Sequence, residues 1–133
     1  MISNPTVRSM GLEILEYSAL PSHGASLLEA NFEEGDLKIL SGAFRKARSE
    51  HERHGIAMSI REIDKRFSPA GASSVLLMLY EHVRCGVCRK QTVERLHAHG
   101  SLPASIANEC RFDAYLPLRQ TIAELVPDPA AQH

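Results

Sequence analysis

Residues 68–88, which read SPAGASSVLLMLYEHVRCGVC, decide the fold. They contain six consecutive apolar residues, Val75–Tyr80, the longest such run in the chain. Ser68 and Pro69 are typical of a helix start, because the serine hydroxyl can accept from a backbone N–H and the fixed φ of proline suits the first helical position. A buried strand is the alternative, but no hairpin turn follows the run. A helix that is apolar on nearly every side is surrounded by its neighbours, so we expect a central helix in an all-α domain.

The rest of the chain predicts shorter, amphipathic helices. Asn4 can cap a first helix, whose stripe follows Val7, Met10 or Gly11, Ile14, and Tyr17 or Ser18. A clearer stripe begins at Asp36 and predicts a helix of about five turns that ends at Gly55, and a further stripe follows over 56–67. No stretch alternates with period two over more than a few residues. We expect seven or eight helices, stacked as antiparallel pairs or packed as an irregular bundle. They would form a single domain over 1–126, followed by a flexible tail over 127–133.

Composition narrows the class of protein. The chain has 133 residues, of which 44% are apolar, so it can bury a core. Its 15 basic and 16 acidic side chains nearly cancel, which argues against a dedicated nucleic-acid or anionic-membrane binder. No stretch is long and apolar enough to span a bilayer, and the N-terminus lacks the pattern of a signal peptide. With three cysteines, an odd number, these features predict a cytoplasmic protein whose thiols are not paired in disulfides.

The C-terminal third carries a familiar arrangement of residues. A helix over 89–100 is followed by Leu102-Pro103 and a short helix that ends at Cys110; Asp113 and then Leu118-Arg119 precede a last amphipathic helix. From Cys85 to Val126 this resembles the inter-repeat turn of HEAT-like helical repeats. The resemblance implies structural roles for Asp113 and Arg119, in which the carboxylate takes helix N–H groups and pairs with an arginine of a neighbouring repeat. It also implies a scaffold with an extended recognition surface.

The spacing His82-x-x-Cys85-x-x-Cys88, with Cys110 further along, is the strongest chemical motif. A C-x-x-C pair can supply two thiolates to a zinc ion, which takes four nitrogen or sulfur ligands in structural sites. His82 and Cys110 are the candidates for the other two. Two alternatives stay open. The cysteines can be small buried apolar residues, or Cys85, beside Arg84 and Arg89 at a helix start, can be a reactive thiol.

Basic side chains form a second candidate site. The residues Arg45–Arg53 and Arg61–Arg66 would face phosphate groups if their two helices packed side by side, although acidic residues are interleaved. The candidate contacts are Arg45, Arg48, Arg53, Arg61 and Lys65. The sequence contains no Gly-rich phosphate loop and no G-x-S-x-G motif.

Together these patterns predict a small, non-catalytic helical adaptor or regulator that binds another protein through one helical face. It would need no cofactor, apart from the zinc ion that the cysteines suggest. A nucleic-acid-associated helical protein and a zinc-binding module are the alternatives. A second copy of the chain is another candidate partner, because it could partly cover the apolar run Val75–Tyr80.

Overall fold

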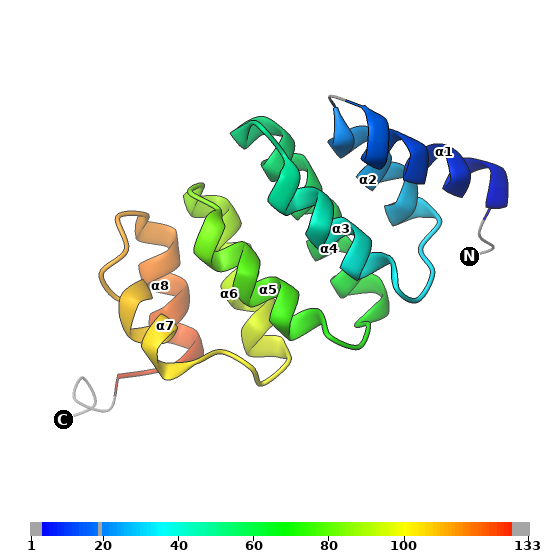
Figure 1. Cartoon of the computed structure of the whole chain (residues 1–133). Helices are drawn as coiled ribbons and strands as arrows, with labels where there is room; N and C mark the ends of the chain where they lie inside the picture. The colour runs from blue at the N-terminus through cyan, green and yellow to red at the C-terminus, as the bar shows by residue number, and fades with distance from the viewer. Residues whose placement is uncertain (1–3, 19, 129–133) are drawn as a thin grey trace. The chain divides into compact units, whose positions relative to one another are not determined.

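The computed structural model describes residues 4–18 and 20–128, and these residues form helices and no strands. The all-α class predicted from the sequence is therefore confirmed, with eight helices in the described part of the chain (Figure 1). They are α1 (Pro5–Tyr17), α2 (Pro21–Ala30), α3 (Asp36–Lys46), α4 (Glu50–Phe67), α5 (Ala72–His82), α6 (Gly86–Ala98), α7 (Ala104–Cys110) and α8 (Leu116–Leu125). None of these helices is long and apolar enough to cross a membrane.

The chain divides into two compact units, residues 1–75 (unit 1) and 76–133 (unit 2). The single domain over 1–126 stays a prediction. Of the predicted flexible tail, residues 129–133 lie outside the described part of the chain.

Unit 1 begins with α1, whose start follows the predicted cap. The side chain of Asn4 accepts from the backbone N–H groups of Thr6 and Val7 at 3.0 and 3.1 Å. α1 and α2 pack side by side at two glycines (Figure 1). A Cβ atom on Gly24 would lie 2.5 Å from the carbonyl oxygen of Gly11, so the two backbones approach more closely than any side chain would allow.

An ion pair links the first and third helices of unit 1. Arg8 of α1 donates through Nη1 and Nη2 to the two carboxylate oxygens of Asp36, the first residue of α3, at 2.5 and 3.1 Å. Nη1 also donates to the carbonyl oxygen of Asn31 at 2.6 Å. Because Asp36 is only 2% exposed, this pair is shielded from water and fixes α3 against α1.

The third and fourth helices differ from the prediction. The expected five-turn helix from Asp36 to Gly55 is interrupted at residues 47–49, and Gly55 lies inside α4. Ser49 lies in this break, and its hydroxyl caps α4 by accepting from the N–H of Glu52 at 3.1 Å. Gly55 is required by close packing, since a Cβ atom there would lie 2.7 Å from Cβ of Ser22.

The α4–α5 connection corrects a second expectation. Ser68 ends α4 in the left-handed conformation, with φ +40°, and does not start the next helix. Gly71 also has a positive φ, +81°, so α5 begins only at Ala72. The apolar run Val75–Tyr80 is helical as predicted and lies within α5.

Unit 2 packs α6, α7 and α8 around one apolar cluster. α6 ends at Ala98, and Gly100, the residue after the C-cap His99, has φ +67°, as is common at this position. Tyr80 and Tyr115 pack against the cluster from outside. Its buried members are Val93, Ala107, Cys110, Leu118 and Ile122.

Candidate functional site

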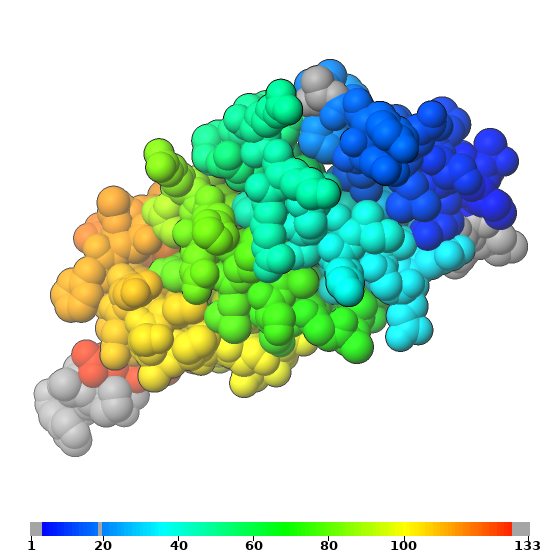
Figure 2. Space-filling model, viewed as in Figure 1, coloured from blue at the N-terminus to red at the C-terminus, as the bar shows by residue number. Residues whose placement is uncertain are grey.

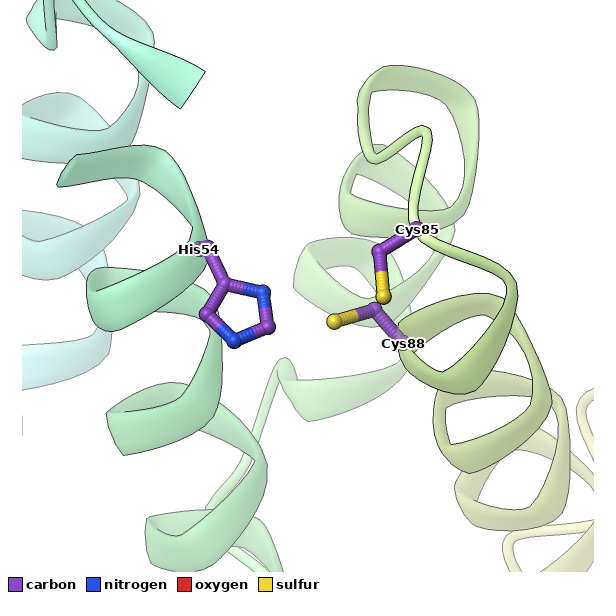
Figure 3. Close-up of side chains that lie close together, drawn as sticks. All are labelled: His54, Cys85 and Cys88. Atoms are coloured by element: carbon purple, nitrogen blue, oxygen red, sulfur yellow. The ribbon is translucent and has the colours of Figure 1, made fainter. Parts of the chain in front are cut away.

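Two thiols lie close together at the start of α6. Cys85 is the N-cap residue of this helix and Cys88 is its third residue. Their Sγ atoms lie within 4.8 Å of each other, and they form no disulfide. Figure 3 shows both sulfur atoms on the same side of the first turn of α6; it also draws His54, a half-buried residue of α4 in unit 1. Cys85 is half-buried and Cys88 is buried. The predicted C-x-x-C pair therefore offers two convergent sulfur ligands.

The guanidinium of Arg89 fixes the chain on both sides of this thiol pair. Its Nη1 donates to the carbonyl oxygen of Arg84, the residue just before Cys85. Its Nε and Nη2 donate to the two carboxylate oxygens of Asp113 at 2.9 and 2.8 Å. One side chain thus joins the segment that enters α6 to the turn that precedes α8. This limits movement of Cys85 relative to the helix.

Tyr115 supports the same turn from outside. Its backbone N–H donates to Asp113 Oδ1 at 2.9 Å, and its ring packs on Gly86. A Cβ atom on Gly86 would lie 2.6 Å from the ring, so the residue after Cys85 has to be glycine. Within α6, the hydroxyl of Thr92 donates to the carbonyl oxygen of Cys88 at 2.8 Å. The backbone next to both cysteines is therefore held in place by packing and by hydrogen bonds.

One guanidinium and the N-terminus of α6 lie near the thiol pair. The guanidinium of Arg89 is close enough to Cys85 for the two groups to interact electrostatically. The same guanidinium lowers the pKa of Asp113, mainly through the hydrogen bonds between them, and Asp113 raises the pKa of Arg89 in return. The first N–H groups of a helix add a partial positive charge at the position of an N-cap side chain.

The structure does not bring the other two predicted ligands into this pair. Cys110 is fully buried in the apolar cluster of unit 2, with its Sγ 3.7 Å from the hydroxyl oxygen of Tyr80. Burial raises the pKa of the Cys110 thiol. His82 is the exposed last residue of α5 and, like Cys110, is not part of the group of converging ligand atoms to which Cys85 and Cys88 belong. The apolar interpretation of the cysteines therefore describes Cys110 best.

The two residues named by the HEAT-like resemblance have different surroundings. Asp113 pairs with Arg89 and accepts from the N–H of Tyr115. Arg119 is the fourth residue of α8, and its charge makes the smallest of the contributions that lower the pKa of Asp113. No sequence pattern indicates Arg89, because it precedes Asp113 by 24 residues.

The outer face of α1 forms a second candidate site, in unit 1. Met10 and Tyr17 are 52% and 76% exposed, and Ile14 lies between them on the same side of the helix. With Glu13 and Ser18 these three residues line a hollow of about 340 Å³. We call this surface the α1 face. Figure 2 shows α1, in blue, at the surface of the molecule.

A second hollow of about 370 Å³ begins on the other side of Tyr17. It runs from the C-terminal end of α1 to the C-terminal end of α3, where Lys46 and Arg48 line it together with Ala43 and Ala47. Tyr17 and Ser18 belong to both hollows. Tyr17 therefore borders both hollows; the charged residue of the first is Glu13, and those of the second are Glu16, Lys46 and Arg48.

The predicted basic patch does not form one exposed surface. Arg61 is only 6% exposed. Arg53 donates to Glu50 at 2.7 Å and to the carbonyl oxygen of Ala47 at 3.1 Å, so its charge is partly neutralised by a residue of unit 1. Arg45, Arg48 and Lys65 are exposed. The nucleic-acid interpretation stays a prediction that rests on these three residues.

No family model, curated protein or solved structure matches this chain. We therefore infer its function from the geometry and chemistry of its own residues.

Proposed function

We propose that this chain is a small cytoplasmic helical adaptor or regulator, and that it binds a basic amphipathic helix of another protein on the α1 face. The observation that carries the proposal is the apolar stripe Met10, Ile14 and Tyr17, which lines a hollow of α1 and whose first and last members are exposed. Residues at spacings of four and three occupy one side of a helix, which is the pattern that helix-in-groove recognition uses. Exposed aromatic anchors such as Tyr17 commonly supply most of the binding free energy.

The charges around the stripe define the partner. Glu13 and Glu16 are exposed on α1. The one basic residue of this helix, Arg8, is paired with Asp36. The carboxylates also raise the pKa of Tyr17, chiefly through the charge of Glu16. A second copy of α1 would bring like charges together, whereas lysine or arginine residues beside the apolar anchors of a partner would be attracted.

We also propose that the chain is HEAT-like, as the resemblance implied. Two ion pairs of the same design support this. Arg8 and Arg89 are each the fourth residue of their helix, and each binds an aspartate at or just before the start of the helix after next. Arg119 is the fourth residue of α8, where a following repeat would supply the aspartate. A helical-repeat scaffold presents helix faces for recognition, which agrees with an adaptor role.

Two designed helical peptides test the partner chemistry. Both carry leucines at i, i+4 and i+7; one has lysines and the other glutamates beside them. We expect the lysine peptide to bind and to shift the NMR signals of Met10, Ile14 and Tyr17, and the glutamate peptide to bind at least about tenfold more weakly. Reversal of charge in Glu13→Lys with Glu16→Lys should exchange the two preferences.

Matched variants show whether the α1 face is responsible. Tyr17→Ala should weaken binding of the lysine peptide about tenfold, as loss of an aromatic anchor does. Phe112→Ser is the control, because Phe112 is 86% exposed and belongs to unit 2. Equal binding of both peptides, or equal losses in the two variants, would overturn the proposal.

A further inference from the structure

We propose that Cys85 and Cys88 form a metal-binding dithiolate that takes one zinc ion, with water or other small ligands from solution in the remaining positions. Nothing in the adaptor role requires this site, so the two proposals stand independently. The cation is specified by the ligands, since two thiolates select zinc over the hard cations magnesium and calcium.

The geometry of the pair fits one shared ion. With Zn–S bonds of about 2.3 Å and a tetrahedral angle, the two sulfur atoms of a zinc site lie roughly 3.8 Å apart. The Sγ atoms of Cys85 and Cys88 lie within 4.8 Å, so closure needs at most a small side-chain rotation. The x-x spacing places both sulfur atoms on one side of the first turn of α6 (Figure 3).

Hydrogen bonds hold the backbone on both sides of the two proposed ligands. The Arg89 guanidinium holds the carbonyl of Arg84 and the carboxylate of Asp113, while Thr92 holds the carbonyl of Cys88. These contacts fix the backbone on both sides of the ligands before any ion arrives. Fixed ligands lose less conformational entropy when they bind a metal, and residues that orient ligands commonly contribute 10–100-fold to its affinity.

Charge and proton balance complete the chemistry. Each thiol releases a proton when its sulfur binds the ion, so up to two protons leave and Zn²⁺ gains two negative ligands. No electron is transferred.

Cobalt titration of the reduced, full-length chain tests the site. We expect Co²⁺ to bind one equivalent and to give thiolate-to-cobalt charge-transfer absorption, which Zn²⁺ then abolishes by displacement. Cys85→Ser and Cys88→Ser should each weaken cobalt binding at least about tenfold, whereas Cys110→Ser should bind as the unmodified chain does. Cys110 is the matched control because it is a buried cysteine outside the pair.

A second readout uses the unmodified chain and needs no variant. Zinc should protect Cys85 and Cys88 from a maleimide, with the modified residues mapped by mass spectrometry, and should leave the reactivity of Cys110 unchanged. Absence of the charge-transfer absorption at micromolar Co²⁺, or a loss in Cys110→Ser equal to that in Cys85→Ser, would overturn the proposal. So would unchanged maleimide reactivity of both paired thiols in the presence of zinc.

Discussion

Arg89 and Asp113 form a doubly hydrogen-bonded ion pair, with Nε–Oδ2 and Nη2–Oδ1 distances of 2.9 and 2.8 Å. The side chains are 20% and 12% exposed, so water screens the pair only weakly. The carboxylate also accepts from the backbone of Tyr115. Loss of this carboxylate therefore removes three hydrogen bonds and leaves a guanidinium with less compensation.

Asp113→Asn should lower the free energy of unfolding by about 2 kcal/mol, between the values for exposed and for fully buried pairs. Urea denaturation measures the change. The control is Glu94→Gln, which breaks the exposed i,i+4 pair with Lys90 and should cost less than about 0.5 kcal/mol. Equal losses in the two variants would show that the Arg89–Asp113 pair stabilises the fold no more than an exposed pair does.

The same pair predicts the response to acid. Arg89 holds the pKa of Asp113 below its ordinary value of 3.8. The unfolded chain therefore binds a proton at a higher pH than the folded chain does, so the contribution is complete above the ordinary pKa and is lost as pH falls through the folded one. The free energy of unfolding of the unmodified chain should fall more steeply below pH 3.8 than that of Asp113→Asn. Parallel curves for the two proteins would contradict this assignment.

Two glycines inside helices should respond to alanine in opposite ways. Gly86→Ala places a Cβ atom 2.6 Å from the Tyr115 ring and should destabilise the chain by about 1–3 kcal/mol, despite the better helix propensity of alanine. Gly42→Ala in α3 meets no atom within 4 Å and should stabilise it by up to about 1 kcal/mol. Thermal melting of both variants checks the prediction. Stabilisation by both would mean that Tyr115 moves aside without cost.

The three cysteines should differ in reactivity toward a thiol reagent in the metal-free chain. Cys85 is half-buried beside a guanidinium and should react first. Cys110 is fully buried and its pKa is raised by burial, so it should react last and only as unit 2 opens. Mass spectrometry of timed samples gives the order. Early modification of Cys110 would contradict the packing of the apolar cluster.

Local patterns in the sequence were sufficient for helix content but not for every boundary. Val75–Tyr80 was recognisable as helical, and Asn4 caps α1 as its residue type predicts. The α3–α4 break was missed because the apolar stripe continues through Ala47, which hides the interruption. The signal was present in Ser49 and Glu52, whose spacing is that of a capping box. The start of α5 was wrongly predicted at Ser68, because serine followed by proline also suits the end of a helix.

The same holds for the candidate sites: what depends on local spacing was predictable, and what depends on contacts between helices was not. The thiol pair was predictable, because x-x spacing alone brings Cys85 and Cys88 together on one turn. The partner of Asp113 was not, since pairing across 24 residues depends on how three helices fold. The α1 face was also missed. Its stripe could equally have pointed inward, and only the contact of Gly11 with Gly24 turns Met10 and Tyr17 outward.

The Arg8–Asp36 and Arg89–Asp113 pairs each join residues that are close in the chain, 28 and 24 positions apart. Such short separations cost little loop-closure entropy, so contacts of this kind form early. During synthesis on the ribosome, the first pair can close as soon as α3 has emerged, before unit 2 has emerged. Each unit of the nascent chain thus contains an ion pair that can form without the other unit.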